Sequence, residues 1–192
     1  MKIISGKFKG RVIEMPRAIR PTSDKVREAL FEILKGRIEG ASFLDLYCGS
    51  GAMGIEALSR GAETVSFVDN SLKSVSILKK NLSILGLSDA SYINIYKKNT
   101  LIVLRDFEKL RLKFDIIFLD PPYHNDLAKN SLIEISNYDI LTRNAIIATE
   151  IYKKESLPEA IGPLRKTRTS RYGDTVLEFF KNEKDSSISR KF

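Results

Sequence analysis

The chain has 192 residues, and its hydrophobic fraction of 43% is ordinary for a globular protein with a sizeable core. It has no run of roughly 18 consecutive apolar residues and no long apolar segment near its first residue. We therefore expect a cytoplasmic protein with neither a membrane span nor a secretory signal. A single cysteine excludes an internal disulfide, and one cysteine with one histidine gives too few ligands for a zinc site, so we expect no metal.

The net charge of +8 is unevenly distributed along the chain. The first 20 residues hold six basic residues and one acid, a net of +5. The six are Lys2, Lys7, Lys9, Arg11, Arg17 and Arg20. A second basic cluster comprises Arg165, Lys166, Arg168 and Arg171. Two such clusters favour a polyanionic partner such as nucleic acid, with an ordinary solvated surface as the alternative.

The first element in chain order is a basic hairpin. Residues 2–5 and 11–15 are predicted to be short strands joined by a glycine-bracketed turn. The turn places Phe8 between Lys7 and Lys9, a mixture of aromatic and basic side chains that suits RNA. Alternatively, Phe8 anchors the hairpin to the rest of the molecule.

A helix is predicted after a proline-bracketed linker, with Thr22, Ser23 and Asp24 as candidate N-cap residues. Its apolar stripe consists of Val26, Ala29, Leu30, Ile33 and Leu34. We expect an N-terminal extension over residues 1–20, one main domain over 21–182 and a disordered tail over 183–192.

From residue 42 onward strands and helices alternate, which is typical of a parallel α/β sheet. The expected strands are Ser42–Leu46, Thr64–Val68, Ser91–Ile95, Phe114–Leu119 and Ala145–Thr149. The expected helices cover about 52–60, 71–85, 100–110 and 127–137. Residues 164–170 and 175–181 predict an antiparallel hairpin. The fold class is therefore α/β, with a mostly parallel seven-stranded sheet, a C-terminal antiparallel hairpin and the small N-terminal β-hairpin.

A glycine-rich turn follows the first of the expected sheet strands. Gly49, Gly51 and Gly54 match the G-x-G-x-x-G pattern between a strand and a helix. Asp69 ends the next strand, where a carboxylate can bind ribose hydroxyls. This pattern is also typical of dinucleotide enzymes, but Asp45 would repel a pyrophosphate and attract a cationic group, such as the amino-acid end of S-adenosylmethionine.

The fourth of these strands ends in Asp120-Pro121-Pro122-Tyr123. Each proline fixes φ and removes a backbone donor, so the chain leaves the sheet here. The Asp120 carboxylate and the Pro121 carbonyl are acceptors beside the aromatic ring of Tyr123. This arrangement suits a planar substrate that carries an NH₂ group, although Asp-Pro and Pro-Pro are also ordinary turn dipeptides.

These motifs resemble known families. Residues 45–51 are similar to the cofactor motif of class I S-adenosylmethionine-dependent methyltransferases, and 120–123 to the catalytic motif of those that methylate exocyclic or amide nitrogens. Residues 20–31, 49–62 and 172–174 narrow the resemblance to the RsmD family, which methylates a guanine N2 in bacterial 16S ribosomal RNA.

The resemblance implies a Rossmann-like methyltransferase fold and S-adenosylmethionine as cofactor. The implied cofactor residues are Thr22, Asp45, Tyr47, Gly49, Gly51, Asp69, Asn70 and Asn99. The implied catalytic residues are Asp120, Pro121, Pro122 and Tyr123. The expected RNA contacts are Lys7, Phe8, Lys9, Arg11, Arg20, Arg168 and Arg171. Many relatives carry an Asp at Asn99 that contacts the adenine amine, and the amide oxygen of Asn99 can still accept that hydrogen bond. We expect a monomer, and the implied partner is 16S ribosomal RNA, alone or in a partly or fully assembled small subunit.

Alternatives remain open at this stage. His124, the only histidine, follows the acceptor motif as a general-base candidate or as an ordinary loop residue. Both motifs also occur in DNA adenine-N6 or cytosine-N4 methyltransferases, and protein glutamine-N5 methyltransferases use a Pro-Pro-Tyr motif. A non-enzymatic RNA-binding factor for ribosome assembly fits the charge equally well.

Overall fold

The computed structural model describes residues 1–15, 24–123 and 126–183. The chain forms two compact units, Met1–Thr100 and Leu101–Phe192. The predictions for Arg20, Thr22 and His124 lie outside the described residues. In the described part of the chain, no helix combines the length and the apolar character that a membrane crossing needs.

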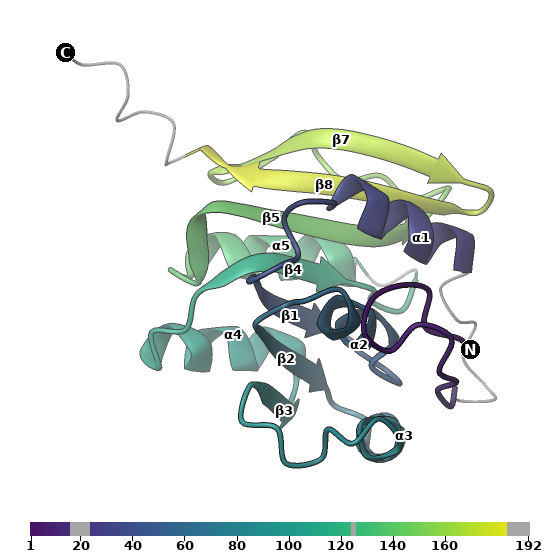
Figure 1. Ribbon diagram of the computed structural model, residues 1–192. Helices are drawn as coiled ribbons and strands as arrows, with labels where there is room; N and C mark the ends of the chain where they lie inside the picture. The colour runs from purple at the N-terminus through teal and green to yellow at the C-terminus, as the bar shows by residue number, and fades with distance from the viewer. Residues whose placement is uncertain (16–23, 124–125, 184–192) are drawn as a thin grey trace. The chain divides into compact units, whose positions relative to one another are not determined.

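The first unit contains a three-stranded parallel sheet with the order β3-β2-β1 (Figure 1). The strands are β1 (Ser42–Leu46), β2 (Thr64–Asp69) and β3 (Ile93–Lys97). The helices of this unit are α1 (Asp24–Ile33), α2 (Ala52–Ser59) and α3 (Leu72–Ile84). The apolar residues of β1 and β2 are buried, as expected for parallel strands. Because the strands are parallel, their carboxyl ends share one edge, which carries the turn after β1.

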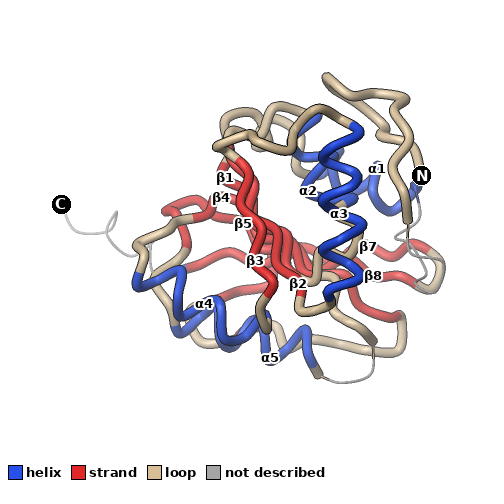
Figure 2. Tube along the Cα trace, turned by 90° about the horizontal axis from the view of Figure 1, so that it is seen from below, coloured by secondary structure: helices blue, strands red, loops and turns tan. Residues whose placement is uncertain are grey.

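Helix α2 packs closely on β2. A Cβ atom added at Gly54 would lie 2.3 Å from Cε1 of Phe67 and 2.9 Å from Cγ1 of Val65. A glycine is therefore needed in this helix for the close approach of helix and strand. In Figure 2, α2 and α3 lie on the same face of the strands of this unit.

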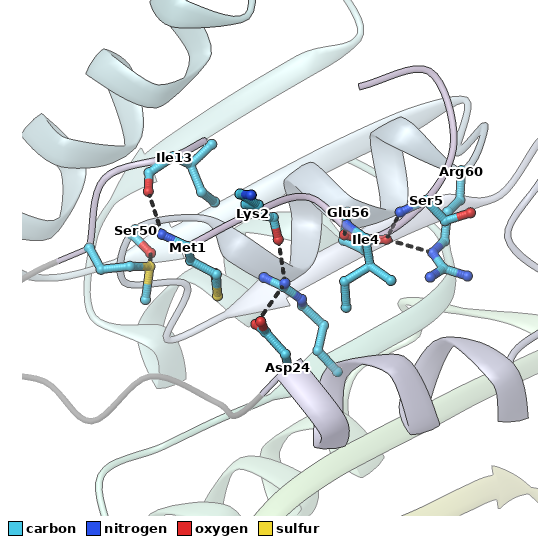
Figure 3. A network of polar contacts seen from close by, with 11 residues as sticks. Met1, Lys2, Ile4, Ser5, Ile13, Asp24, Ser50, Glu56 and Arg60 are labelled. Carbon is cyan, nitrogen blue, oxygen red and sulfur yellow. Dashed lines mark hydrogen bonds and ion pairs between the residues drawn. The ribbon is translucent and has the colours of Figure 1, made fainter. Parts of the chain in front are cut away.

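The N-terminal hairpin is present, but its strands are shorter than predicted. One antiparallel bridge joins Lys2 and Val12, and the Ile3 N–H donates to the Arg11 carbonyl at 3.0 Å. The ladder stops there because the next two backbone donors have another partner. The N–H groups of Ile4 and Ser5 donate to the Glu56 carboxylate on α2, at 2.8 and 3.0 Å (Figure 3). Residues 1–15, here called the N-terminal segment, are thus attached to a helix rather than extended into a sheet.

The second unit contains five strands in the order β4-β5-β8-β7-β6. These are β4 (Phe114–Leu119), β5 (Leu141–Tyr152), β6 (Ala160–Ile161), β7 (Leu164–Tyr172) and β8 (Thr175–Asn182). Strands β4 and β5 are parallel, and the other pairings are antiparallel. The described residues thus form eight strands, three in one unit and five in the other, instead of the seven predicted. The additional strand is the two-residue β6, which is too short for a sequence pattern to reveal.

Two further helices are α4 (Thr100–Lys109), which begins at the last residue of the first unit, and α5 (Leu127–Asn137), which lies in the second unit. Their bounds are close to the predicted ones. Strand β5 is longer than the predicted 145–149 because it pairs with β4 from Leu141 onward and with β8 as far as Tyr152. The tail expected to be disordered lies outside the described residues from position 184 onward, and the predicted domain boundaries stay predictions.

Candidate functional site

The turn after β1 has an unusual backbone. Tyr47, Gly49 and Gly51 have φ angles of 61°, 53° and 80°, all in the left-handed region. That region favours glycine, and a bulky residue such as Tyr47 adopts it at a cost of order 1–3 kcal/mol. The turn is closed by hydrogen bonds in which the Gly51 N–H donates to the Cys48 carbonyl at 2.7 Å and the Cys48 N–H donates to Val68 at 3.0 Å. A strained turn held in this way is typical of a ligand-binding loop.

The three glycines of the motif serve different purposes. A Cβ atom at Gly51 would lie 2.3 Å from Cδ1 of Leu78, and Gly54 is restricted by Phe67. These two positions require glycine for packing. A Cβ atom at Gly49 would meet no atom within 4 Å, so the space beside this residue is open to an approaching ligand. Gly49 is therefore the glycine at which the backbone can come close to a cofactor.

Asp69 joins the turn to the end of β2. Its Oδ2 accepts a hydrogen bond from the Gly49 N–H at 2.9 Å, and its Oδ1 accepts one from the Ser71 N–H at 2.8 Å. Each carboxylate oxygen has two acceptor sites, so Asp69 retains capacity for hydroxyl donors while it fixes the turn.

Asp45 lies beneath the turn and is only 1% exposed. Its Oδ2 accepts a hydrogen bond from the Gly54 N–H at 2.8 Å. Burial, opposed by the hydrogen bond from Gly54 and assisted by the Asp69 charge, raises the pKa of Asp45 to about 7. The carboxylate predicted to attract a cationic group thus titrates near neutral pH.

The remaining predicted cofactor residues of the first unit lie along the same edge of its sheet. Asn70 directly follows β2, and Asn99 follows β3 at the start of α4. Both are exposed. The register pairs Leu46 with Val68 and Asp69 with Lys97, which aligns the carboxyl ends of the three strands.

Asn81, which the sequence analysis did not identify, connects the N-terminal segment to the turn. Its side chain is completely buried on α3. The amide accepts a hydrogen bond from the Glu14 N–H at 2.7 Å and donates to the carbonyls of Glu14 and Ser50, each at 3.0 Å. The Ser50 hydroxyl also contacts Sδ of Met15 at 3.0 Å. A polar residue within the apolar stripe that contains Leu78 and Leu82 was the available sequence signal.

In the second unit, Asp120 and Pro121 follow β4 as predicted, and the side chain of Tyr123 is held in place. Its hydroxyl donates to Oε1 of Glu150 at 3.1 Å, and its ring lies 5.7 Å from that of Tyr152. Burial and the nearby Glu150 charge raise the pKa of Tyr123, so its hydroxyl stays protonated. Glu150, an acid within an apolar strand, was another functional candidate that sequence reasoning missed.

Tyr123 lines a hollow of about 90 Å³ together with both prolines of the motif. Leu127 and Leu157 contribute apolar atoms to its wall, and Glu150 contributes polar ones. The hollow is built entirely from residues of the second unit. An aromatic ring whose orientation is fixed by a hydrogen bond can position a flat ligand.

The predicted RNA-contact residues occupy several places. The turn with Lys7, Phe8 and Lys9 contacts Ser59 at the C-terminal end of α2, whereas the glycine turn precedes the N-terminal end of this helix. Eight helical residues separate these ends by about 12 Å. Nη2 of Arg11 donates to the Ile84 carbonyl at the end of α3, at 2.7 Å, which stabilises that helix terminus.

The two predicted RNA-contact residues of the second unit lie on β7. Arg171 is exposed, and Nε of Arg168 donates to the Ser170 hydroxyl at 3.1 Å. Within the described ranges, no group of three or more Cys, His, Asp and Glu side chains could hold a metal ion.

Comparison with known proteins places the chain in a family. The model of the family described as "Conserved hypothetical protein 95" matches residues 1–181. The chain belongs to this family. It is 32% identical over 160 residues to the Escherichia coli protein named "Ribosomal RNA small subunit methyltransferase D", covering 82% of this chain and 78% of the relative. The predicted resemblance to the RsmD family is thus confirmed.

Further relatives cover more of the chain. YlbH of Bacillus subtilis, named as a candidate rRNA methyltransferase, is 38% identical over 183 residues, which is 94% of this chain and 98% of YlbH. Among solved structures, yhhF of Escherichia coli, named as a candidate methyltransferase, matches with a TM-score of 0.81 and 29% identity over 95% of this chain and 97% of its own. This likeness confirms the Rossmann-like α/β fold predicted from the sequence.

Proposed function

We propose that this chain transfers a methyl group from S-adenosylmethionine to the exocyclic N2 amine of a guanine in small-subunit ribosomal RNA. The observation that carries the proposal is the loop after β4, where Asp120, two prolines and Tyr123 follow directly on a buried strand. The names of relatives that cover most of the chain support an RNA methyltransferase with a small-subunit substrate. The choice of guanine N2 rests on the acceptor chemistry of the loop and on the family resemblance.

The residues of the glycine turn fit the proposed cofactor. The backbone at Gly49 is open to a ligand, Asp69 has acceptor capacity for the ribose hydroxyls, and Asn99 can accept from the adenine amine. The ionised Asp45 would attract the cationic amino-acid end. When bound, the cofactor supplies an electrophilic methyl group on a sulfonium centre.

Residues 120–123, here called the acceptor loop, supply the hydrogen-bond acceptors that would make a guanine amine more nucleophilic. The lone pair of this amine is delocalised into the ring, so the nitrogen is a poor nucleophile. In the proposed reaction, the Asp120 carboxylate and the Pro121 carbonyl accept hydrogen bonds from the two N–H groups of the amine. These bonds draw the nitrogen toward tetrahedral geometry. The bound sulfonium would supply the methyl group to this nitrogen and would leave as a neutral thioether, and Asp120 or water would take the proton that the nitrogen loses.

Tyr123 has a positioning role in this proposal. Stacking of a base on an aromatic ring is worth about 1–3 kcal/mol. The hydrogen bond to Glu150 fixes the ring before the substrate arrives, which lowers the entropic cost of alignment. The guanine must be unpaired or flipped out of a helix for its amine to reach the loop. We propose a monomer acting on 16S ribosomal RNA, alone or in a partly or fully assembled subunit.

The test is transfer of a labelled methyl group from S-adenosylmethionine to small-subunit RNA and to assembled subunits, followed by nucleoside analysis. We expect label in N2-methylguanosine. Label in another nucleoside would support an RNA methyltransferase and would show that guanine N2 is not its target. If neither substrate accepts label while the cofactor binds, the proposal is wrong, and DNA and protein substrates come next.

A variant assigns the role of the acceptor loop. Asp120→Ala should abolish turnover and leave the affinity for the cofactor within about twofold of the wild type. Asp139→Ala, at an exposed carboxylate of the same unit, is the matched control and should retain turnover. Loss of cofactor binding in Asp120→Ala would contradict the assigned role.

A further inference from the structure

In addition to the hollow beside Tyr123 in the second unit, a hollow is present in the first unit, at the end of α2 opposite the glycine turn. It measures about 200 Å³. Leu58, Ala62 and Leu87 are buried in its wall, and two aromatic residues, Phe8 and Tyr92, also line it. Two charged residues, Lys7 and Glu63, complete the lining. None of these residues is among the proposed cofactor-binding or catalytic residues. Lys7 and Phe8 are among the predicted RNA contacts.

The turn that carries Lys7 and Phe8 is fixed to α2. The Lys7 N–H donates to the Ser59 carbonyl at 2.7 Å, and the Phe8 N–H donates to the Ser59 hydroxyl at 2.9 Å. A Cβ atom at Gly6 would lie 1.7 Å from that carbonyl oxygen, so only glycine fits there. The turn is also closed internally by the Lys9 N–H, which donates to the Gly6 carbonyl at 3.1 Å. Phe8 is therefore presented by a preorganised backbone.

The chemistry of the hollow combines apolar surface, aromatic rings and positive charge. The Lys7 ammonium lies 5.4 Å from the centre of the Phe8 ring, within the range of a cation–π contact. Tyr92 is 39% exposed, and Lys9 lies on the same turn as Lys7. Aromatic rings beside lysines form the arrangement that holds unpaired bases, because rings stack on bases while ammonium groups contact phosphates.

We propose that this hollow binds an unpaired nucleobase of the RNA substrate, at a contact additional to the one with the methylated guanine. The proposal rests on the proposed function in taking RNA as the ligand. Charge complementarity selects a nucleotide over an apolar protein side chain, since Lys7 lines the hollow and the described residues 1–15 carry four basic side chains and one acid. The contact would hold the RNA on the first unit without taking part in methyl transfer.

The experiment measures equilibrium binding of small-subunit RNA to the full chain. Tyr92→Leu keeps an apolar side chain and removes the ring face, and Lys7→Gln removes the ammonium while keeping a polar chain. The matched controls are Tyr138→Leu and Lys35→Gln, at residues that do not line this hollow. Ultraviolet crosslinking of the wild type to the RNA, with the linked peptides identified by mass spectrometry, locates the contact.

We expect Tyr92→Leu to raise the Kd for RNA and the KM about tenfold, and Lys7→Gln to raise both several-fold, with kcat and cofactor affinity unchanged. We also expect crosslinks at Phe8 or Tyr92. An unchanged Kd in Tyr92→Leu, or crosslinks only elsewhere, would overturn the proposal. An effect confined to assembled subunits, with crosslinks to a ribosomal protein, would assign the hollow to a protein contact instead. If this inference is wrong, the wild type still transfers methyl groups to the RNA. If the proposed function is wrong, the wild type transfers none.

Discussion

A buried carboxylate that titrates near neutral pH is an uncommon component of a binding turn. Asp45 is a carboxylate whose charged form is disfavoured by burial and by Asp69, although a hydrogen bond from Gly54 partly stabilises it. The pKa in the folded protein is about 7, compared with 3.8 ordinarily. The folded state therefore holds a proton that the unfolded state has lost between about pH 4 and pH 7, and the free energy of unfolding falls as the pH rises through this window.

The same titration predicts proton release on cofactor binding. A cationic group near Asp45 lowers its pKa, so binding at pH 7 should release about half a proton, and binding at pH 9 should release almost none, because the carboxylate is already ionised. Calorimetry in buffers of different ionisation enthalpy measures this number directly. Asp45→Asn should bind the cofactor without the release. Equal release by the wild type and by this variant would show that another group titrates.

A second residue, Asn81, tests the link between the N-terminal segment and the glycine turn. In Asn81→Asp, the donor to the Glu14 and Ser50 carbonyls becomes an acceptor in a buried site. We expect a loss of about 2–3 kcal/mol in the free energy of unfolding, together with a weaker affinity for the cofactor. Chemical denaturation and calorimetry measure the two effects. Asn137→Asp on the exposed end of α5 is the control. An equal loss of unfolding free energy in this control would contradict the role assigned to the buried Asn81 amide.

Among the elements, α2 bears the most constraints, because its N-terminal end follows the glycine turn and its C-terminal end carries the N-terminal segment. Glu56 accepts hydrogen bonds from Ile4, Ser5 and Arg60 although it is completely buried. A displacement of α2 on its sheet would thus disturb both ends.

Gly54→Ala tests the contact between α2 and β2. In an exposed helix the substitution stabilises a protein by about 0.4–1 kcal/mol, but here the new methyl group would overlap the ring of Phe67. We expect a destabilisation of about 1–3 kcal/mol, measured by chemical denaturation. Combining it with Phe67→Leu should cost less than the sum of the two single variants, because the smaller side chain makes room. Strict additivity of the two changes would contradict the steric explanation.

The success of sequence reasoning differed from element to element for physical reasons. The bounds of β1 and β4 were predicted correctly, because their apolar runs end at the turn after Leu46 and at Asp120. The N-terminal strands were overestimated because their donors are used by Glu56, a residue 52 positions from Ile4. The roles of Asn81 and Glu150 were missed for the same reason, since their partners are distant in sequence. Local patterns predicted the motifs, but they could not predict which buried polar groups join them.

At the scale of the whole molecule, the net charge of +8 makes RNA binding dependent on salt. The logarithm of the affinity should fall linearly with the logarithm of the salt concentration, by roughly 0.7 for each phosphate of a single strand that is neutralised. Arg171→Gln, at an exposed position of β7, should reduce this slope by about 0.7, the share of one phosphate contact. Lys35→Gln should leave it unchanged. A slope that is the same in Arg171→Gln and in the wild type would remove Arg171 from the interface.

The position of the N-terminal segment in the chain has a consequence for synthesis. Glu14 and its partner Asn81 are 67 positions apart, a distance that translation at roughly 5–20 residues per second covers in about 3–13 s. The segment is therefore already available when α2 and α3 emerge, so the buried side chains of Glu56 and Asn81 find their partners as soon as their helices form. A circular permutant with residues 1–15 moved to the end of the chain would leave both side chains without these partners until translation had finished.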